Sequence, residues 1–432
     1  MMESAILKGF SVENYASFAD PVHFTCSADL SKKDYETNAF ASGDLFINRV
    51  SYIYGANGSG KTFFSKILRE IQRYVSLSPL SILDSTRLKE VLPNEEFLRP
   101  VQQFAFDTAY RDKPTTFGID LIIGKTTYHY EFSIRGIEIV SELLTKKIRR
   151  TEKILVRTSP FNKDIRVRSE LKEFDGMKST VKPNSLCLSI AAMLNNPLAQ
   201  SIVDAIQGIN VLNMTAPRLR PSAEEEAFSS ERIKKYVGIL RKADPTILNM
   251  DISFMEEEIA RQKIESDDFE NREIIQKRTT VGVQTKHAMY QNGYMLENGN
   301  PDIDFFKDES LGTVKLFTML PHLFDALEKG GILILDEIEN GLHLSLVKEI
   351  VNLFNNPKSN PRNAQLICTS HQPLLVNDGV KRDQVWIITK DPYGKSSLHR
   401  LSNLSTSRAS YNLANKLMEG ALGCNPERFF DN

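Results

Sequence analysis

The sequence has few cysteines, no long apolar run and almost no net charge. Its four cysteines (Cys26, Cys187, Cys368, Cys424) form no CxxC or Cys/His pair with metal-ligand spacing, which favours a reducing, cytoplasmic setting. No stretch approaches ~18 apolar residues, and the N-terminus lacks the pattern of a signal peptide, so we expect no membrane segment. The net charge is −1, so any nucleic-acid contact must come from a local basic patch or from a partner.

The chain is long enough for several domains. Its 432 residues, 41% hydrophobic and 25% charged, are ordinary for a globular protein, in which a domain takes roughly 100–200 residues. No heptad pattern is sustained, so a long coiled coil is not expected. Residues 255–278 are densely charged and favour an exposed helix or a mobile segment.

A complete phosphate-binding motif lies near the N-terminus. Residues 55–62 fit the pattern G-x-x-x-x-G-K-[ST], between an apolar strand-like run (50–54) and a helix-forming stretch (63–74). Glycines let backbone N–H groups curve around an anion, and the start of the following helix adds to the attraction. Lys61 can reach the β- and γ-phosphates, and the Thr62 hydroxyl can ligate Mg²⁺. The predicted nucleotide-binding residues are Gly55, Ala56, Asn57, Gly58, Ser59, Gly60, Lys61, Thr62 and Phe63.

Two later apolar strands end in residues suited to phosphate chemistry. Asp336 and Glu337 follow the run 332–335, and His371 follows the run 364–369. Because ligands bind at the carboxyl ends of parallel strands, Asp336 is placed to hold Mg²⁺ and Glu337 to activate water as a general base. His371 can contact the γ-phosphate, although a histidine bonded to backbone carbonyls is the simpler alternative. Its position after the acidic pair favours the functional role.

Residues 309–315, Glu-Ser-Leu-Gly-Thr-Val-Lys, predict the start of a helix. Ser310 can cap this helix, and Gly312 with the exposed N–H groups can form a second anion site. A capped helix with no ligand is the alternative.

The order of these elements is specific. A phosphate loop, a Ser-x-Gly-Thr helix start, an apolar strand ending in Asp-Glu and a strand ending in Ser-His follow one another. In this order, and in the text of residues 54–62, 309–313, 335–343 and 369–372, the chain resembles ABC-type ATPase heads. The group is the one shared by structural-maintenance-of-chromosomes (SMC) proteins, the RecF repair protein and OLD-family proteins. Within it, the chain is most similar to stand-alone ATPases of bacterial abortive-infection and antiphage systems.

The resemblance implies an ATPase that uses ATP and Mg²⁺. Two heads would associate head to tail around two ATP molecules, so that Ser310 and Gly312 touch the γ-phosphate held by Lys61 of the other copy. The catalytic residues would be Glu337, His371 and Lys61. A glutamine at the start of the antiparallel segment normally links Mg²⁺ to conformation; Gln102 or Gln103 would serve, and Gln103 is assigned beside Thr62 and Asp336 as a metal residue.

The expected fold class is α/β. We expect an ABC-ATPase-like head, with a mixed core sheet carrying the phosphate loop and an antiparallel β segment, plus a mainly helical insertion. The antiparallel strands are predicted at 103–106, 116–123 and 127–134. The expected domains are 1–145 (first half of the head), 146–280 (helical insertion lobe) and 281–432 (second half, with the Ser-x-Gly signature).

The function expected from the resemblance is an ATP-driven switch that dimerises, or forms a higher homo-oligomer, around ATP. It would control a nuclease or toxin partner in antiphage defence. The short stretch after His371 leaves no room for the nuclease domain of OLD proteins, so any nuclease would act in trans. The chief alternative is a RecF-like repair ATPase that clamps DNA directly. The basic residues 146–153 and the Arg-Leu-Arg run at 218–220 support that alternative. For residues 146–153, a solvated edge strand protected by charge is the favoured interpretation over a phosphate-contacting patch. A transporter subunit ranks last.

Overall fold

The structure is a computed structural model and describes residues 5–29, 36–82, 99–161, 164–214, 228–264, 272–296, 301–376 and 379–404. The chain forms two compact units. The first comprises Met1–Asn213, Ala326–Glu339 and His343–Asn432, and the second Met214–Asp325 and Asn340–Leu342. These limits differ from the expected domain boundaries at 145 and 280, which stay a prediction.

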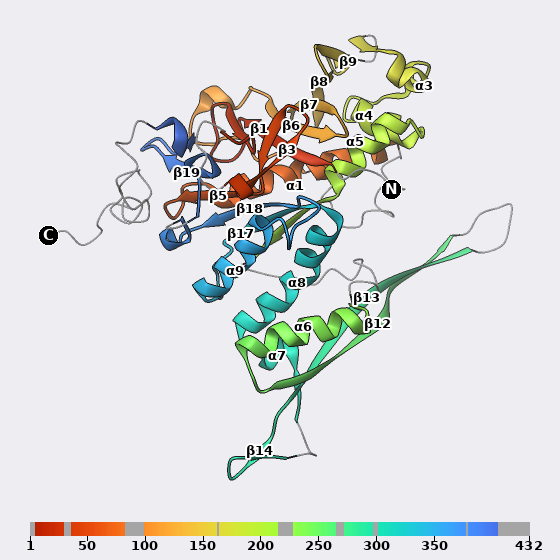
Figure 1. The fold of residues 1–432 in the computed structure, drawn as a ribbon. Helices are drawn as coiled ribbons and strands as arrows, with labels where there is room; N and C mark the ends of the chain where they lie inside the picture. Colours follow the sequence, from red (N-terminus) through yellow and green to blue (C-terminus); the bar gives the residue numbers. More distant parts are fainter. Residues whose placement is uncertain are drawn as a thin grey trace. The chain divides into compact units, whose positions relative to one another are not determined.

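A mixed six-stranded sheet forms the core of the first unit, with the strand order β11-β17-β18-β5-β19-β20. Its strands are β5 (Val50–Gly55), β11 (Ile209–Asn213), β17 (Ile332–Asp336), β18 (Gln365–Ser370), β19 (Val385–Lys390) and β20 (Ser396–Arg400). All neighbours are parallel except β19 and β20. Every residue of β5, β17 and β18 is buried, as expected for parallel strands covered on both faces. These strands lie side by side in Figure 1.

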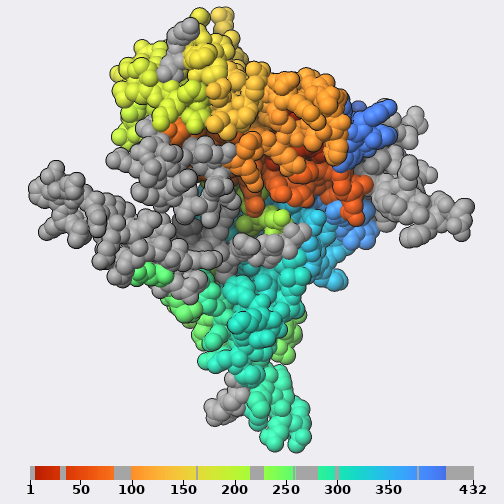
Figure 2. Space-filling model, turned by 180° about the vertical axis from the view of Figure 1, so that it is seen from behind, coloured from red at the N-terminus to blue at the C-terminus, as the bar shows by residue number. Residues whose placement is uncertain are grey.

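A seven-stranded antiparallel sheet has the order β10-β9-β8-β7-β6-β1-β2. Its strands are β1 (Ile6–Glu13), β2 (Val22–Thr25), β6 (Thr115–Ile123), β7 (Thr126–Arg135), β8 (Glu138–Lys147), β9 (Thr151–Arg157) and β10 (Ile165–Val167). On the face of the first unit seen in Figure 2, the orange to yellow segments of this sheet form a continuous surface. The α/β class, with a mixed core sheet and a separate antiparallel segment, is therefore confirmed.

Helix α1 (Lys61–Leu77) joins the two sheets. Its Phe64 ring lies 4.9 Å from the ring of Phe10 on β1 and 5.4 Å from that of Phe24 on β2. The same helix contacts β5, β17 and β18 of the core sheet. Burial of this apolar face stabilises the helix and fixes its first turn, which follows the phosphate loop, against β5.

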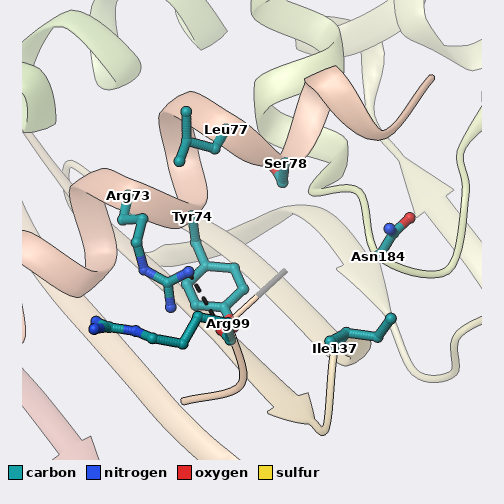
Figure 3. Close-up of a pocket in the computed structure, with 7 residues that line it drawn as sticks. All are labelled: Arg73, Tyr74, Leu77, Ser78, Arg99, Ile137 and Asn184. Atoms are coloured by element: carbon teal, nitrogen blue, oxygen red, sulfur yellow. Dashed lines mark hydrogen bonds between the residues drawn. The ribbon is translucent and has the colours of Figure 1, made fainter. Parts of the chain in front are cut away.

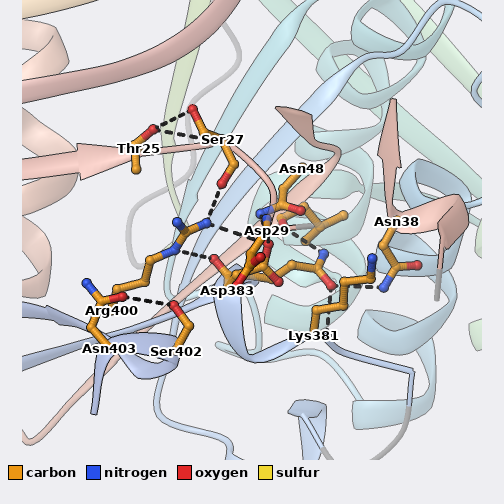
Figure 4. A network of polar contacts seen from close by, with 12 residues as sticks. Thr25, Ser27, Asp29, Asn38, Asn48, Lys381, Asp383, Arg400, Ser402 and Asn403 are labelled. Carbon is orange, nitrogen blue, oxygen red and sulfur yellow. Dashed lines mark hydrogen bonds and ion pairs between the residues drawn. The ribbon is translucent and has the colours of Figure 1, made fainter. Parts of the chain in front are cut away.

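A buried polar network ties the N-terminal strands to the β19–β20 hairpin (Figure 4). Asp383 accepts hydrogen bonds from the backbone N–H of Asp29 (2.7 Å) and from the amide of Asn48 (3.3 Å). Arg400 pairs with the Asp383 carboxylate at 3.6 Å and donates to the Ser27 carbonyl. Because the Asp383 carboxylate is buried, these partners offset its desolvation and fix where β20 begins and ends.

The remaining helices and short strands of the first unit complete these layers. They are β3 (Ala39–Ser42), β4 (Leu45–Asn48), α3 (Lys172–Asp175), α4 (Cys187–Met193), α5 (Pro197–Gln207) and α9 (Leu344–Asn355).

The second unit is built on a long β-hairpin. Its elements are α6 (Ser230–Ala243), β12 (Ile247–Ile264), β13 (Arg272–His287), β14 (Tyr290–Gln291), β15 (Tyr294–Met295), β16 (Asp302–Asp304), α7 (Phe305–Asp308) and α8 (Leu311–Lys329), the last of which belongs to this unit up to Asp325. Helix α6 lies against the β12–β13 hairpin (Figure 1). The rings of Phe305, Tyr236 and Phe228 pack on Phe317 of α8, with centroids 4.9, 6.1 and 6.2 Å away.

The expected helix or mobile segment at 255–278 is wrong in its described part. Residues 255–264 and 272–278 belong to strands β12 and β13. The register places Glu257 opposite Arg278 and Glu258 opposite Lys277. A charge pattern taken from one segment alone does not reveal that partner strand.

Two further expectations also change. Residues 103–106 form no strand, whereas β8 and β9 extend the antiparallel sheet. The basic run 146–153 spans the β8–β9 turn, where residues 151–153 of β9 pair with β8, while β10 pairs with β9 only at Leu155–Arg157. The segment 146–280 also contains strands between its helices, and one of them, β11, pairs in parallel with β17 of the core sheet. The run at 218–220 lies outside the described residues.

Candidate functional site

The phosphate loop connects β5 to α1 and requires glycine at two positions. Gly58 and Gly60 have φ values of 76° and 114°, which residues with a Cβ rarely adopt. A Cβ on Gly60 would also lie 2.7 Å from Ser17 Oγ and 2.8 Å from Ser396 Oγ. The loop is therefore held by residues far away in the sequence as well as by its own motif.

Lys61 begins α1 and turns back into the loop. Its side chain is buried, and Nζ donates to the carbonyls of Gly55 (2.6 Å) and Ala56 (2.9 Å). Ser59 Oγ is buried without a hydrogen-bond partner, while the Ser59 carbonyl accepts from Ser396 Oγ at 2.5 Å. A buried cation, an unpaired hydroxyl and the start of a long helix together make a fitting anion site.

The other predicted loop residues differ in exposure. Asn57 is exposed and Thr62 half-buried at the first turn of α1. Phe63 is also half-buried; its ring meets that of Tyr15 edge-on at 6.4 Å, and the Lys66 ammonium lies 5.6 Å from its centroid. These contacts fix the Phe63 side chain on the protein side of the helix, so only its backbone N–H is available to a phosphate.

Asp336 lies at the end of β17 and is bound to β18. Its Oδ1 accepts a hydrogen bond from Thr369 Oγ1 at 2.8 Å, and Thr369 Oγ1 in turn accepts from the backbone N–H of Glu337 at 2.8 Å. Burial raises the pKa of Asp336, whereas hydrogen bonds from Thr369, Thr62 and Ser65 act in the opposite direction. The Thr62 hydroxyl and the Asp336 carboxylate thus lie together, and both are oxygen donors of the kind that Mg²⁺ prefers.

Glu337 and His371 face each other across the ends of β17 and β18. Glu337 Oε1 lies 3.7 Å from His371 Nε2, and the Glu337 backbone has a φ of 56°, a left-handed conformation uncommon for this residue type. Burial lowers the pKa of His371, and the charge of Lys61 lowers it further. The His371 backbone N–H donates to the Glu339 carboxylate. A neutral His371 beside a carboxylate can orient a water or contact a phosphate oxygen.

The first unit therefore brings together Lys61, Thr62, Asp336, Glu337 and His371 at the carboxyl edge of the core sheet. This is the edge where parallel α/β sheets bind ligands.

Among the described residues, Gln103 makes no hydrogen bond to this group. Its amide donates to the Lys113 carbonyl at 2.7 Å, outside any strand. Gln102 is exposed, and its carbonyl accepts from the backbone N–H of Ala16 at 2.8 Å. The metal role of either glutamine stays a prediction.

The Ser-x-Gly signature belongs to the second unit. Ser310 Oγ accepts from the Thr313 backbone N–H at 3.1 Å, which is the predicted capping contact for α8. A Cβ on Gly312 would lie 2.6 Å from the Gly341 carbonyl. Lys315 is buried and donates to Asn340 Oδ1 at 2.7 Å. The start of α8 and the loop after Glu339 thus form one packed cluster.

Sequence reasoning missed four supporting residues of the first unit: Ser17, Thr369, Ser396 and Glu339. Thr369 and Glu339 stand within the motif text, next to residues that were assigned roles, and a polar residue at a buried strand end was the available signal. Ser17 and Ser396 gave none, because only the tertiary fold brings them to Gly60.

A small cavity lies at the other end of α1 (Figure 3). It is lined by Arg73, Tyr74, Leu77, Ser78, Arg99, Ile137 and Asn184. Its volume of about 20 Å³ has room for about one water molecule, so it is no candidate for nucleotide binding.

In the described part of the chain, no group of three or more His, Cys, Asp and Glu side chains is arranged to hold a metal ion. None of the helices in the described ranges is long and apolar enough to cross a membrane.

Residues 207–377 match the model of the family described as "AAA domain, putative AbiEii toxin, Type IV TA system". The matched region includes Ser310, Asp336, Glu337 and His371 and does not include the phosphate loop. No curated protein matches the chain.

Two solved structures are similar at low identity. The SMC head domain from Thermotoga maritima has a TM-score of 0.37 and 11% identity, covering 91% of this chain and 98% of that chain. An SMC head bound to the C-winged helix domain of ScpA also has a TM-score of 0.37 and 11% identity, covering 91% of this chain and 97% of that chain. At this TM-score neither likeness adds an argument beyond the motifs and the family model.

Proposed function

We propose that this protein is an ATPase head that binds and hydrolyses ATP, which its motifs and the AAA-domain description of the matching family support. The observation that carries this proposal is the convergence of Lys61, Thr62, Asp336, Glu337 and His371 on one sheet edge. These are the groups that phosphoryl transfer to water requires: a phosphate cradle, a metal position and a water-orienting base.

Each residue has a distinct role in this proposal. The loop N–H groups and Lys61 hold the β- and γ-phosphates, and Lys61 exchanges its two carbonyl partners for phosphate oxygens. Thr62 and Asp336 hold Mg²⁺, which neutralises charge on the β- and γ-phosphates when bound. Glu337 accepts a proton from the attacking water, and His371 contacts the γ-phosphate.

We further propose that two copies associate around ATP, with Ser310 of one copy completing the site of the other. Hydrolysis then loosens this association. A switch of this kind needs an associated and a separated state, of which the γ-phosphate stabilises only the associated one. The capped start of α8 offers N–H groups suited to contact the γ-phosphate.

The proposed output is control of a partner effector, a toxin or nuclease, in bacterial defence. The description of the matching family names a toxin and a toxin–antitoxin system, which supports this choice. The RecF-like alternative remains second: of the five basic side chains of the run 146–153, Lys146 is paired with Glu170 at 2.5 Å and with Glu152 at 3.5 Å. Direct DNA binding that weakens steeply with salt would support that alternative.

Two variants test the ATPase proposal. Lys61→Ala should abolish ATP binding in calorimetry, whereas Lys66→Ala, an exposed lysine on the same helix, should not. Glu337→Gln should retain binding, lose turnover and accumulate an ATP-bound dimer in light scattering, with the exposed Glu349→Gln as its matched control. Normal turnover by Glu337→Gln, or a monomer at every nucleotide concentration, would overturn the proposal.

A further inference from the structure

The residue just before the signature, Glu309, is held by the end of strand β13. Its Oε1 accepts hydrogen bonds from Thr285 Oγ1 and from His287 Nε2, both at 2.6 Å. The Glu309 side chain is 5% exposed and that of His287 12% exposed. A carboxylate this far out of water is costly unless it is bonded, so these two partners hold Glu309 in one position.

The two partners are themselves fixed by the second unit. Thr285 is fully buried, and the register places it between Met250 of β12 and Ile303 of β16. His287 is the last residue of β13, and its Nδ1 lies 2.9 Å from Thr246 Oγ1 in the turn before β12. Glu309 is therefore bound to the central strand of a three-stranded sheet, next to the root of the long hairpin.

On its other side, Glu309 adjoins the proposed ATP contact. Ser310 follows it directly, caps α8 through the Thr313 N–H and is exposed, with its carbonyl accepting from the Val314 N–H at 3.0 Å. Gly312 and Lys315 hold the next turn against the loop after Glu339. The position of Ser310 is thus fixed on its C-terminal side by the first turn of α8 and on its N-terminal side by Glu309.

We propose that Glu309 is a positioning residue that couples the β12–β13 hairpin to the signature. It fixes Ser310 through its bonds to Thr285 and His287, so that displacement of β13 changes how Ser310 meets the γ-phosphate held by a second copy. This inference rests on the proposed function, because Ser310 acts on ATP only if the heads associate around it. Coupling of this kind is reciprocal, so γ-phosphate binding at the signature must also stabilise the end of β13.

The first test separates positioning from folding with a matched pair at Thr285. Thr285→Val keeps the shape and removes the hydroxyl, whereas Thr285→Ser keeps the hydroxyl. We expect Thr285→Val and Glu309→Ala to lower the turnover number about tenfold, the scale of a displaced catalytic contact, with the affinity of the isolated head for ATP unchanged. Thr285→Ser should restore turnover, and Glu309→Gln, which keeps an acceptor oxygen, should lie between Glu309→Ala and the parent.

The second test measures the reciprocal effect by hydrogen exchange. In the parent protein, Mg²⁺ with a non-hydrolysable ATP analogue should slow exchange of the backbone amides at 281–287 as well as at the start of α1. In Glu309→Gln, a mild change that we expect to fold, the protection at α1 should remain and that at 281–287 should be reduced. Lys307→Ala, an exposed change in the preceding helix α7, is the control and should behave as the parent.

The outcomes distinguish the two levels of the argument. A parent protein with neither ATP-dependent association nor hydrolysis refutes the proposed function itself. A parent that hydrolyses ATP, with Glu309→Ala and Thr285→Val turning over at the parental rate, refutes only the role of Glu309. Equal loss of turnover in Thr285→Ser and Thr285→Val would show that packing at this position matters and the hydroxyl does not, which also overturns the inference.

Discussion

Replacing Thr369 with valine should destabilise the protein and disturb the acidic end of β17. Thr369 is fully buried, and its hydroxyl is the single link between the Asp336 carboxylate and the Glu337 backbone N–H, with both hydrogen bonds at 2.8 Å. Valine has nearly the same shape and no hydroxyl. The change therefore removes two hydrogen bonds without opening a cavity.

The size of the effect follows from what each group loses. A buried N–H left without a partner costs about 1–3 kcal/mol, and a hydrogen bond to a charged group contributes about 1.5–3 kcal/mol. Thr62 and Ser65 also lower the pKa of the Asp336 carboxyl and so stabilise its charge, which places the loss at the carboxylate at the lower end. We expect a total of about 3 kcal/mol in the free energy of unfolding, roughly a hundredfold in the folding equilibrium. Thr369→Ser loses one methyl group and should cost about 1 kcal/mol.

Urea unfolding of the nucleotide-free protein measures the stability change, and steady-state hydrolysis measures the functional one. The Glu337 backbone is held in its left-handed conformation partly through this N–H, so the turnover number of Thr369→Val should fall by about tenfold to a hundredfold. The serine variant should turn over close to the parental rate. If Thr369→Val unfolds at the parental urea concentration and hydrolyses ATP normally, the role given to this hydroxyl is wrong.

Two further predictions address other parts of the fold. A hydrogen bond with Asp120, and then one with Glu131, raises the pKa of His129 from 6.5 to about 9. Because the pKa of His129 is higher in the folded state than in the unfolded state, protonated His129 stabilises the fold fully below the unfolded pKa, and this stabilisation is lost as pH rises through the folded pKa. Between about pH 6 and 9.5, urea unfolding should therefore show a larger loss of stability in the parent than in His129→Gln. Equal losses in the two proteins would contradict this prediction. Gly312→Ala places a Cβ 2.6 Å from the Gly341 carbonyl, so the start of α8 and the Gly341 loop must move apart at a cost of about 1–3 kcal/mol. Light scattering should then show weaker ATP-dependent association, while calorimetry should still show ATP binding. Parental association by this variant would refute the packing argument.

The candidate site was largely predictable where the chemistry is local. The phosphate loop is one continuous motif, and its flanking strand and helix form as their apolar patterns predicted. Asp336 and His371 follow buried strands in the sequence, and the parallel pairing of β17, β18 and β5 brings their ends to one edge. The general rule for ligand sites in parallel sheets was enough to anticipate that convergence.

Prediction failed where the partner is distant in sequence. The charged segment 255–278, taken alone, does not reveal that a second strand pairs with it. β11 was missed because a short apolar run after a helix is compatible with either a further helical segment or a strand. In each case long-range pairing outweighed the local pattern.

The sequence by itself determined the proposed chemistry: which side chains would hold a phosphate, a magnesium ion and a water, and in what order they occur. Those properties belong to residue types and short spacings, which folding does not change. Only the tertiary structure decided how these groups are supported. Ser17 and Ser396 confine Gly60, Thr369 joins the two acidic residues, and Thr285 with His287 holds Glu309. Such contacts depend on strand register and burial, which are properties of the whole folded chain.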